Sequence, residues 1–130
     1  MSGGDRQWVH ALCADSPEYL RAIELFNAGE YFAAHEAFES LWRCSTGTER
    51  LFYQGLTQAA VALHHVRRGN LRGARSVAER ARARLACVPS PFRALDTVDF
   101  AEQLRRFIED PARAPVPRIQ LAVLDPTERM

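Results

Sequence analysis

Apolar residues recur every three or four positions along most of this chain, which is the spacing of the inner face of an amphipathic helix. The pattern is interrupted at Asn27-Ala28-Gly29, Ser45-Thr46-Gly47, Gly69-Asn70 and Pro89. Residues of these types end helices or form the turns between them. The pattern therefore predicts an all-α fold, a compact array of about five helices at residues 16–27, 30–43, 48–68, 71–88 and 98–109.

Two of these segments carry further signals. Ser16-Pro17-Glu18 is typical of a helix start, with a capping hydroxyl, a proline in the first turn and an acidic residue after it. The third segment is the most apolar, and a helix that is apolar nearly all round belongs at the centre of a domain. We therefore expect the other helices to pack around the third one.

The two ends of the chain differ from the helical domain, which we place at residues 16–110. Residues 1–15 are predicted to be a loosely held N-terminal arm with Trp8, Val9 and Leu12 as anchors. Residues 111–130 contain too many prolines for a helix and are predicted to be an extended C-terminal arm. Such an arm packs across the bundle or onto a partner chain, which leaves a homo-oligomer open.

An internal repeat aligns two helical hairpins at an offset of forty residues. Gly29, Ala34 and Glu39 correspond to Gly69, Ala74 and Glu79. Each unit is a helix, a glycine corner and a second helix, which resembles a tetratricopeptide hairpin, although that repeat is usually about 34 residues long. Two units are too few for a solenoid, so the repeat predicts a compact array.

The second predicted helix places a histidine among aromatic residues. Tyr31, His35, Phe38 and Trp42 fall on one stripe, with Glu39 at its border. A buried polar group without a partner costs about 1–3 kcal/mol, so we predict a buried polar network between the second and third helices. Its expected members on the third helix share one stripe: Gln54, Gln58 and His65.

Three ordered motifs resemble the small prokaryotic family known as domain of unknown function 309. They are F-N-A-G-E-Y-F-A-A-H-E-A-F-E-S-L-W, F-Y-Q-G-L-T-Q-A-A-V-A-L-H-H and R-R-G-N-L-R-G-A, within residues 22–85. The resemblance implies an all-helical single domain and brings no established activity. Thr57 departs from the family pattern, which has an aliphatic residue there, and its hydroxyl would alter any pocket beside the glutamines.

The favoured functional hypothesis is a binding or scaffold module for an unknown small molecule or protein partner, without a cofactor. A cleft with a few convergent polar groups is the usual form of a ligand site. Aromatic residues near the predicted network could line such a cleft, although aromatic residues at helical spacing more often pack in a core. The candidate binding residues are Tyr31, Trp42, Arg43, Gln54, Gln58 and His65, with Phe52 and Tyr53 beside them.

A metal-dependent hydrolase is the first alternative. The sequence H-E-A-F-E is one residue away from the zinc signature H-E-x-x-H. In this hypothesis His35 and Glu39 bind the ion, Glu36 activates water, and His64 or His65 completes the ligand set. Whether the chain is an enzyme stays open at this point.

Nucleic-acid binding is the second alternative, and charge distribution is its basis. Residues 1–66 hold four Arg and eight acidic residues, whereas residues 67–130 hold thirteen Arg and eight acidic residues. The basic face of the fourth helix consists of Arg68, Arg72, Arg75 and Arg82. Glu79 interrupts this face and no aromatic residue is interleaved for base stacking, so we expect a solvated surface.

Length and composition fix the broad class. A chain of 130 residues with 47% hydrophobic residues can bury a core without a metal or disulfide. Cys13, Cys44 and Cys87 are odd in number and widely spaced, which predicts reduced thiols and, with a polar N-terminus, a cytoplasmic protein. The longest uncharged run, residues 51–66, is too short to span a membrane, which needs about 20 apolar residues.

Overall fold

Residues 16–122 fold into five helices in succession, which confirms the predicted fold class. The computed structural model describes residues 16–122, so both the N-terminal arm and residues 123–130 lie outside the described part. The helices are α2 (Pro17–Asn27), α3 (Tyr31–Arg43), α4 (Gly47–Arg67), α5 (Leu71–Leu85) and α6 (Thr97–Glu109). Within residues 16–122 the only strand-like features are isolated bridges at Phe92, Leu95 and Leu121.

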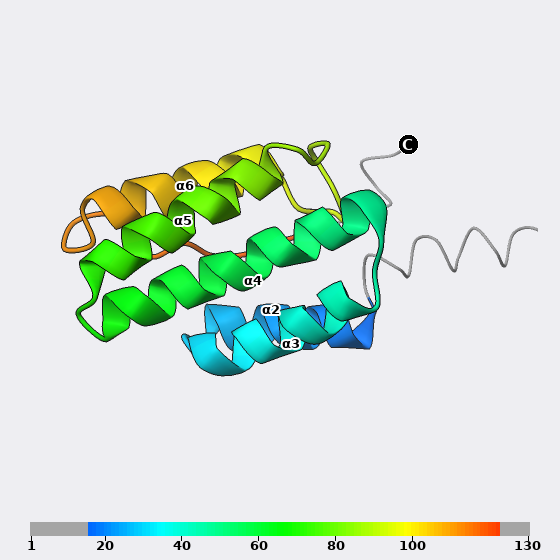
Figure 1. Cartoon of the computed structure of the whole chain (residues 1–130), viewed down its shortest axis with the longest axis horizontal. Helices are drawn as coiled ribbons and strands as arrows, with labels where there is room; N and C mark the ends of the chain where they lie inside the picture. Colours follow the sequence, from blue (N-terminus) through cyan, green and yellow to red (C-terminus); the bar gives the residue numbers. More distant parts are fainter. Residues whose placement is uncertain (1–15, 123–130) are drawn as a thin grey trace, which may run out of the picture.

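Helix α4 is the central element, as its composition predicts. It runs across the middle of the molecule with the α2–α3 pair on one side and the α5–α6 pair on the other (Figure 1). Small side chains allow this crowding, since Ala59, Ala60 and Ala62 are fully buried. Leu56 and Leu63 supply the larger apolar groups on the same helix.

The glycine corners of the predicted repeat have the same geometry. Gly29 and Gly69 have φ angles of 83° and 79°, the left-handed region that glycine adopts at little cost. In each corner the next residue donates a backbone hydrogen bond across the helix end: Glu30 to Leu25 at 2.9 Å and Asn70 to His65 at 2.8 Å. This is the Schellman arrangement that satisfies carbonyls at a helix C-terminus. The similarity to tetratricopeptide hairpins stays a prediction.

Helix α5 ends three residues earlier than predicted. The chain continues from Leu85 into a tighter turn, in which Cys87 donates to the Arg84 carbonyl at 3.0 Å and Val88 to Leu85 at 3.1 Å. Val88 is still buried, because the turn carries it back against the core. An apolar residue at helical spacing therefore packs in the core without being helical.

The C-terminal arm, as far as residue 122, packs against its own chain. Asn27 joins α2 to this arm through two hydrogen bonds with the Ile119 backbone, each 2.9 Å long. Further along, Ala122 donates to the Ala94 carbonyl at 2.8 Å. The arm passes behind α4 in Figure 1, so it closes the back of the bundle.

Gly55 marks the closest approach of α4 to α5. A Cβ atom at this position would lie 2.8 Å from the Leu85 side chain and 3.4 Å from the Ala81 carbonyl oxygen. Leu85 is buried and has little room to move. Glycine is therefore required here by packing, at the cost of its low helix propensity.

We predict that Gly55→Ala lowers the free energy of unfolding by up to about 2 kcal/mol, because overpacking costs about 1–3 kcal/mol and helix propensity returns only about 1. In a Leu85→Ala background the same change should be neutral or stabilising. Urea denaturation of the four variants of this cycle measures the coupling. An equal loss in both backgrounds would contradict the proposed contact.

Asn27→Ala should lower the free energy of unfolding by about 1–3 kcal/mol, because it leaves the Ile119 backbone groups without partners. Hydrogen exchange at the Ile119 amide should become faster as the arm detaches from α2. Gln120→Ala, a change at an exposed position of the same arm, is the control. Unchanged exchange at Ile119 would show that other contacts hold the arm.

Candidate functional site

Helix α3 turns His35 partly toward solvent. The buried stripe of this helix is formed by Tyr31, Ala34 and Phe38, and His35 lies next to it. The side chains of His35 and Glu39 are 24% and 29% exposed. Glu36 is exposed.

The polar contacts of His35 and Glu39 stay within α3. His35 Nε2 lies 3.8 Å from Glu39 Oε1, and His35 Nδ1 lies 3.2 Å from the Phe32 carbonyl oxygen. Arg43 donates a hydrogen bond of 3.2 Å to Glu39. Between Ser16 and Ala122 no hydrogen bond joins His35 or Glu39 to α4, so the predicted buried network is wrong.

The reason lies in the orientation of α4. His64 lies on the side that meets α3, where its ring is 5.9 Å from that of Phe32. His65, about 100° further round, lies 3.4 Å from the Asn70 side chain at the start of α5. Gln54 and Gln58 share the partly exposed stripe of His65, and within residues 16–122 no hydrogen bond joins either of them to α3.

The departure from the family pattern at Thr57 has only a local effect. Thr57 is buried, and its hydroxyl donates a 2.7 Å hydrogen bond to the Tyr53 carbonyl oxygen within α4. The hydroxyl is therefore satisfied by its own helix. It does not face a pocket beside the glutamines.

The aromatic residues of the predicted cleft are mostly core residues. Phe52 and Tyr53 are buried, and their ring centroids are 5.2 Å apart. Tyr31 packs edge-on against Phe26 at 5.5 Å, and the Arg67 guanidinium lies 4.8 Å from the Tyr31 ring centroid. Burial raises the pKa of the Tyr31 hydroxyl, and the charge of Arg67 acts in the opposite direction.

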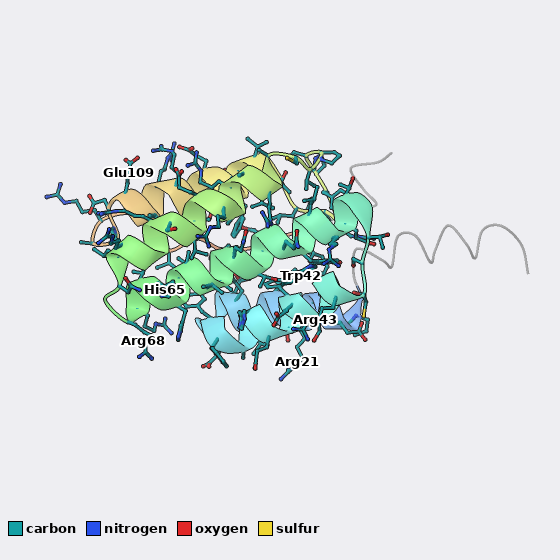
Figure 2. The ribbon with its side chains drawn as sticks, viewed as in Figure 1. Arg21, Trp42, Arg43, His65, Arg68 and Glu109 are labelled. Carbon is teal, nitrogen blue, oxygen red and sulfur yellow. The ribbon has the colours of Figure 1, made fainter. Side chains whose placement is uncertain are left out.

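Trp42 is the exception among these aromatic residues. It lies at the boundary between α3 and α4 (Figure 2), and the Arg50 guanidinium is 5.5 Å from its ring centroid. Its indole Nε1 is buried and has no hydrogen-bond partner within residues 16–122, and the same holds for Gln58 Oε1. Arg43, labelled in the same figure, is exposed on the outer side of α3.

An exposed aromatic cluster on α3 and α4 was not predicted. Phe32 is 56% exposed, and its ring lies 5.3 Å from that of His35 and 5.9 Å from that of His64. We call these three residues the Phe32 cluster. In the sequence, Phe32 is a large apolar residue that directly follows Tyr31 of the buried stripe and stands three residues before His35.

A metal site does not form from the predicted ligands. Among the residues that the structure describes, no three His, Cys, Asp or Glu side chains lie close enough together to hold a metal ion. His35 and Glu39 supply two such groups, but His65 faces Asn70. The hypothesis of a metal-dependent hydrolase therefore has no ligand set in the part of the chain that is described.

The remaining candidates are surface residues. Arg68, Arg72 and Arg75 are exposed, and Arg82 lies 3.9 Å from Glu79. Cys44 and Cys87 are free, exposed thiols, whereas Cys13 lies outside the described residues. None of the described helices combines the length and apolar character that crossing a bilayer requires.

This chain is similar to a known family and to known proteins. The family model described as Domain of unknown function (DUF309) matches residues 19–77. An uncharacterized protein of Aquifex aeolicus (strain VF5) is 30% identical over 86 residues, covering 65% of this chain and 25% of that protein. The crystal structure of a conserved hypothetical protein from Thermus thermophilus is 33% identical, with a TM-score of 0.64, and the match covers 72% of this chain and 97% of that one. This chain thus spans about a quarter of the length of the curated relative that it matches.

His35→Ala should change the free energy of unfolding by no more than about 1 kcal/mol, because the pair that it breaks is partly solvated and confined to one helix. Phe38→Ala, on the buried stripe of the same helix, should cost about 3–5 kcal/mol. Thermal and urea denaturation compare the two variants. A loss of about 3 kcal/mol or more for His35→Ala would instead support the predicted buried network.

Proposed function

We propose that this chain, which belongs to the DUF309 family matched above, is a binding module. The Phe32 cluster is the centre of its contact surface for a protein partner. The observation that carries this proposal is the exposure of Phe32 between two imidazole rings.

An exposed phenylalanine has a physical cost that binding would remove. Phe32 is more than half exposed to water, while Phe26, Phe38 and Phe52 are fully or almost fully buried. Aromatic residues are enriched at protein interfaces, where a few buried anchors carry most of the binding energy. Phe32 therefore supplies an apolar anchor for a side chain of the partner.

The residues around Phe32 supply directional contacts. His35 and His64 come from two different helices and present ring nitrogens next to the apolar ring. Glu36 is exposed on the same helix, one residue beyond His35. An apolar centre with a polar rim is the usual composition of an interface between soluble proteins.

The scaffold below the Phe32 cluster is well packed. Tyr31 and Ala34 on α3 and Ala60 and Leu63 on α4 are buried. Surfaces held by packed helices bind with a smaller loss of conformational entropy than loops do. The match to a quarter of the longer Aquifex aeolicus protein fits a module that occurs beside other sequence.

The proposal predicts that a photo-reactive phenylalanine analogue at position 32 cross-links a protein partner in cells of the organism that makes this chain. The same analogue at Val98, an exposed apolar position on α6, should give a much lower yield. Mass spectrometry then identifies the cross-linked protein. Equal yields at the two positions would argue against a specific surface.

With that partner purified, Phe32→Ala should weaken binding by about tenfold or more, as expected for truncation of an interface anchor. Val98→Ala is the matched control and should leave the dissociation constant unchanged. Because Phe32 is exposed, its truncation should change the free energy of unfolding by less than about 0.5 kcal/mol. Unchanged affinity for Phe32→Ala would overturn the proposed function.

A further inference from the structure

A second surface, formed by other helices than the Phe32 cluster, lies between α5 and α6. These helices run side by side along one edge of the molecule (Figure 1). A groove of about 370 Å³ opens between them, a volume in the usual range of small-molecule sites. We call it the α5–α6 groove. Its apolar floor includes Ala78 and Ile108, which are buried side chains of the two helices.

The arginines that line the α5–α6 groove are not equally neutralised. Arg105 is held by two carboxylates, at 2.7 Å from Glu102 and 2.6 Å from Glu109. The hydrogen bond from Arg105 is the largest effect on Glu102 and lowers the pKa of its carboxyl group to about 2. Arg105 is therefore occupied by acidic neighbours.

Arg75 and Arg82 remain available. Within residues 16–122, the only acidic contact of Arg82 is Glu79, at the long distance of 3.9 Å, and Arg75 makes no ion pair or hydrogen bond. These two arginines are seven residues apart, which places them on one side of α5 about two turns apart. They flank the stretch of α5 that contributes Ala78 to the floor.

We infer that the α5–α6 groove binds a small organic oxyanion, an apolar body that carries a phosphate or carboxylate group. The guanidinium groups of Arg75 and Arg82 fit the oxyanion, since arginine binds phosphate and carboxylate groups alike through paired hydrogen bonds. Ala78 and Ile108 fit the apolar body. The arginines alone would also bind an inorganic anion, and the apolar floor alone would also bind a neutral molecule. The two together select a ligand that has both a charge and an apolar body.

The experiment uses the full chain, labelled with ¹⁵N, and phenyl phosphate as the probe. Titration followed by NMR should give saturable shifts centred on Arg75, Ala78, Arg82 and Ile108. Inorganic phosphate should bind about tenfold more weakly because it lacks the apolar body, and benzyl alcohol should not bind because it lacks the charge. Benzoate tests whether a carboxylate replaces the phosphate.

Three variants locate the site. Arg75→Gln and Arg82→Gln should each weaken phenyl phosphate binding by about tenfold, the loss expected for a charge-assisted hydrogen bond. Arg80→Gln is the matched control, because this exposed arginine of α5 does not line the groove. Glu79→Gln should tighten binding about twofold or more, since it removes the acid next to Arg82, and a gain cannot result from misfolding.

Several results would overturn the inference. Absence of saturable shifts, or equal affinity for inorganic phosphate and phenyl phosphate, would show that the groove is not a built site. An equal loss for Arg80→Gln and Arg82→Gln would assign the effect to overall charge. Binding of duplex DNA that weakens equally on substitution of Arg68, Arg72 and Arg75 would favour a nucleic-acid surface instead.

Discussion

Close packing of α4 against helices on both of its sides governs most features of this structure. A helix in that position cannot carry large side chains all round, so alanines at positions 59, 60 and 62 and Gly55 occupy its tightest contacts. Small residues bury little apolar area themselves. They bring the backbones close, and the larger groups at Phe52, Leu56 and Leu63 then complete a dense core.

The same packing decides where polar groups on α4 can lie. Most of the surface of α4 is covered by α3, α5 and the core. Polar side chains of α4 are therefore confined to the borders of these packed faces. His64 and His65 are adjacent in sequence but fall at different edges, one beside Phe32 and the other beside Asn70. This separation keeps His65 away from His35 and Glu39, and it leaves His64 to complete the exposed Phe32 cluster.

Two surfaces result, and they differ in chemistry. The Phe32 cluster is aromatic, exposed and formed by α3 and α4, which suits an apolar anchor from a protein partner. The α5–α6 groove is concave, has an apolar floor and presents two weakly neutralised arginines, which suits a small anion. They lie on different helix pairs of one helical array. The proposed ligand site and the proposed partner surface are therefore separate.

The helices, their corners and the central place of α4 could be predicted from the sequence, because those features follow from local spacing. Gly29 and Gly69 end helices whatever the tertiary arrangement, and the apolar residues of α4 need burial in any packing. The environment of His35, in contrast, depends on tertiary packing. On a helical wheel His35 lies at the border of the buried stripe. A small rotation of α3 against α4 would place His35 in the core or at the surface. Periodicity cannot fix that rotation, since it depends on the fit of Tyr31, Ala34 and Phe38 against the neighbouring helices.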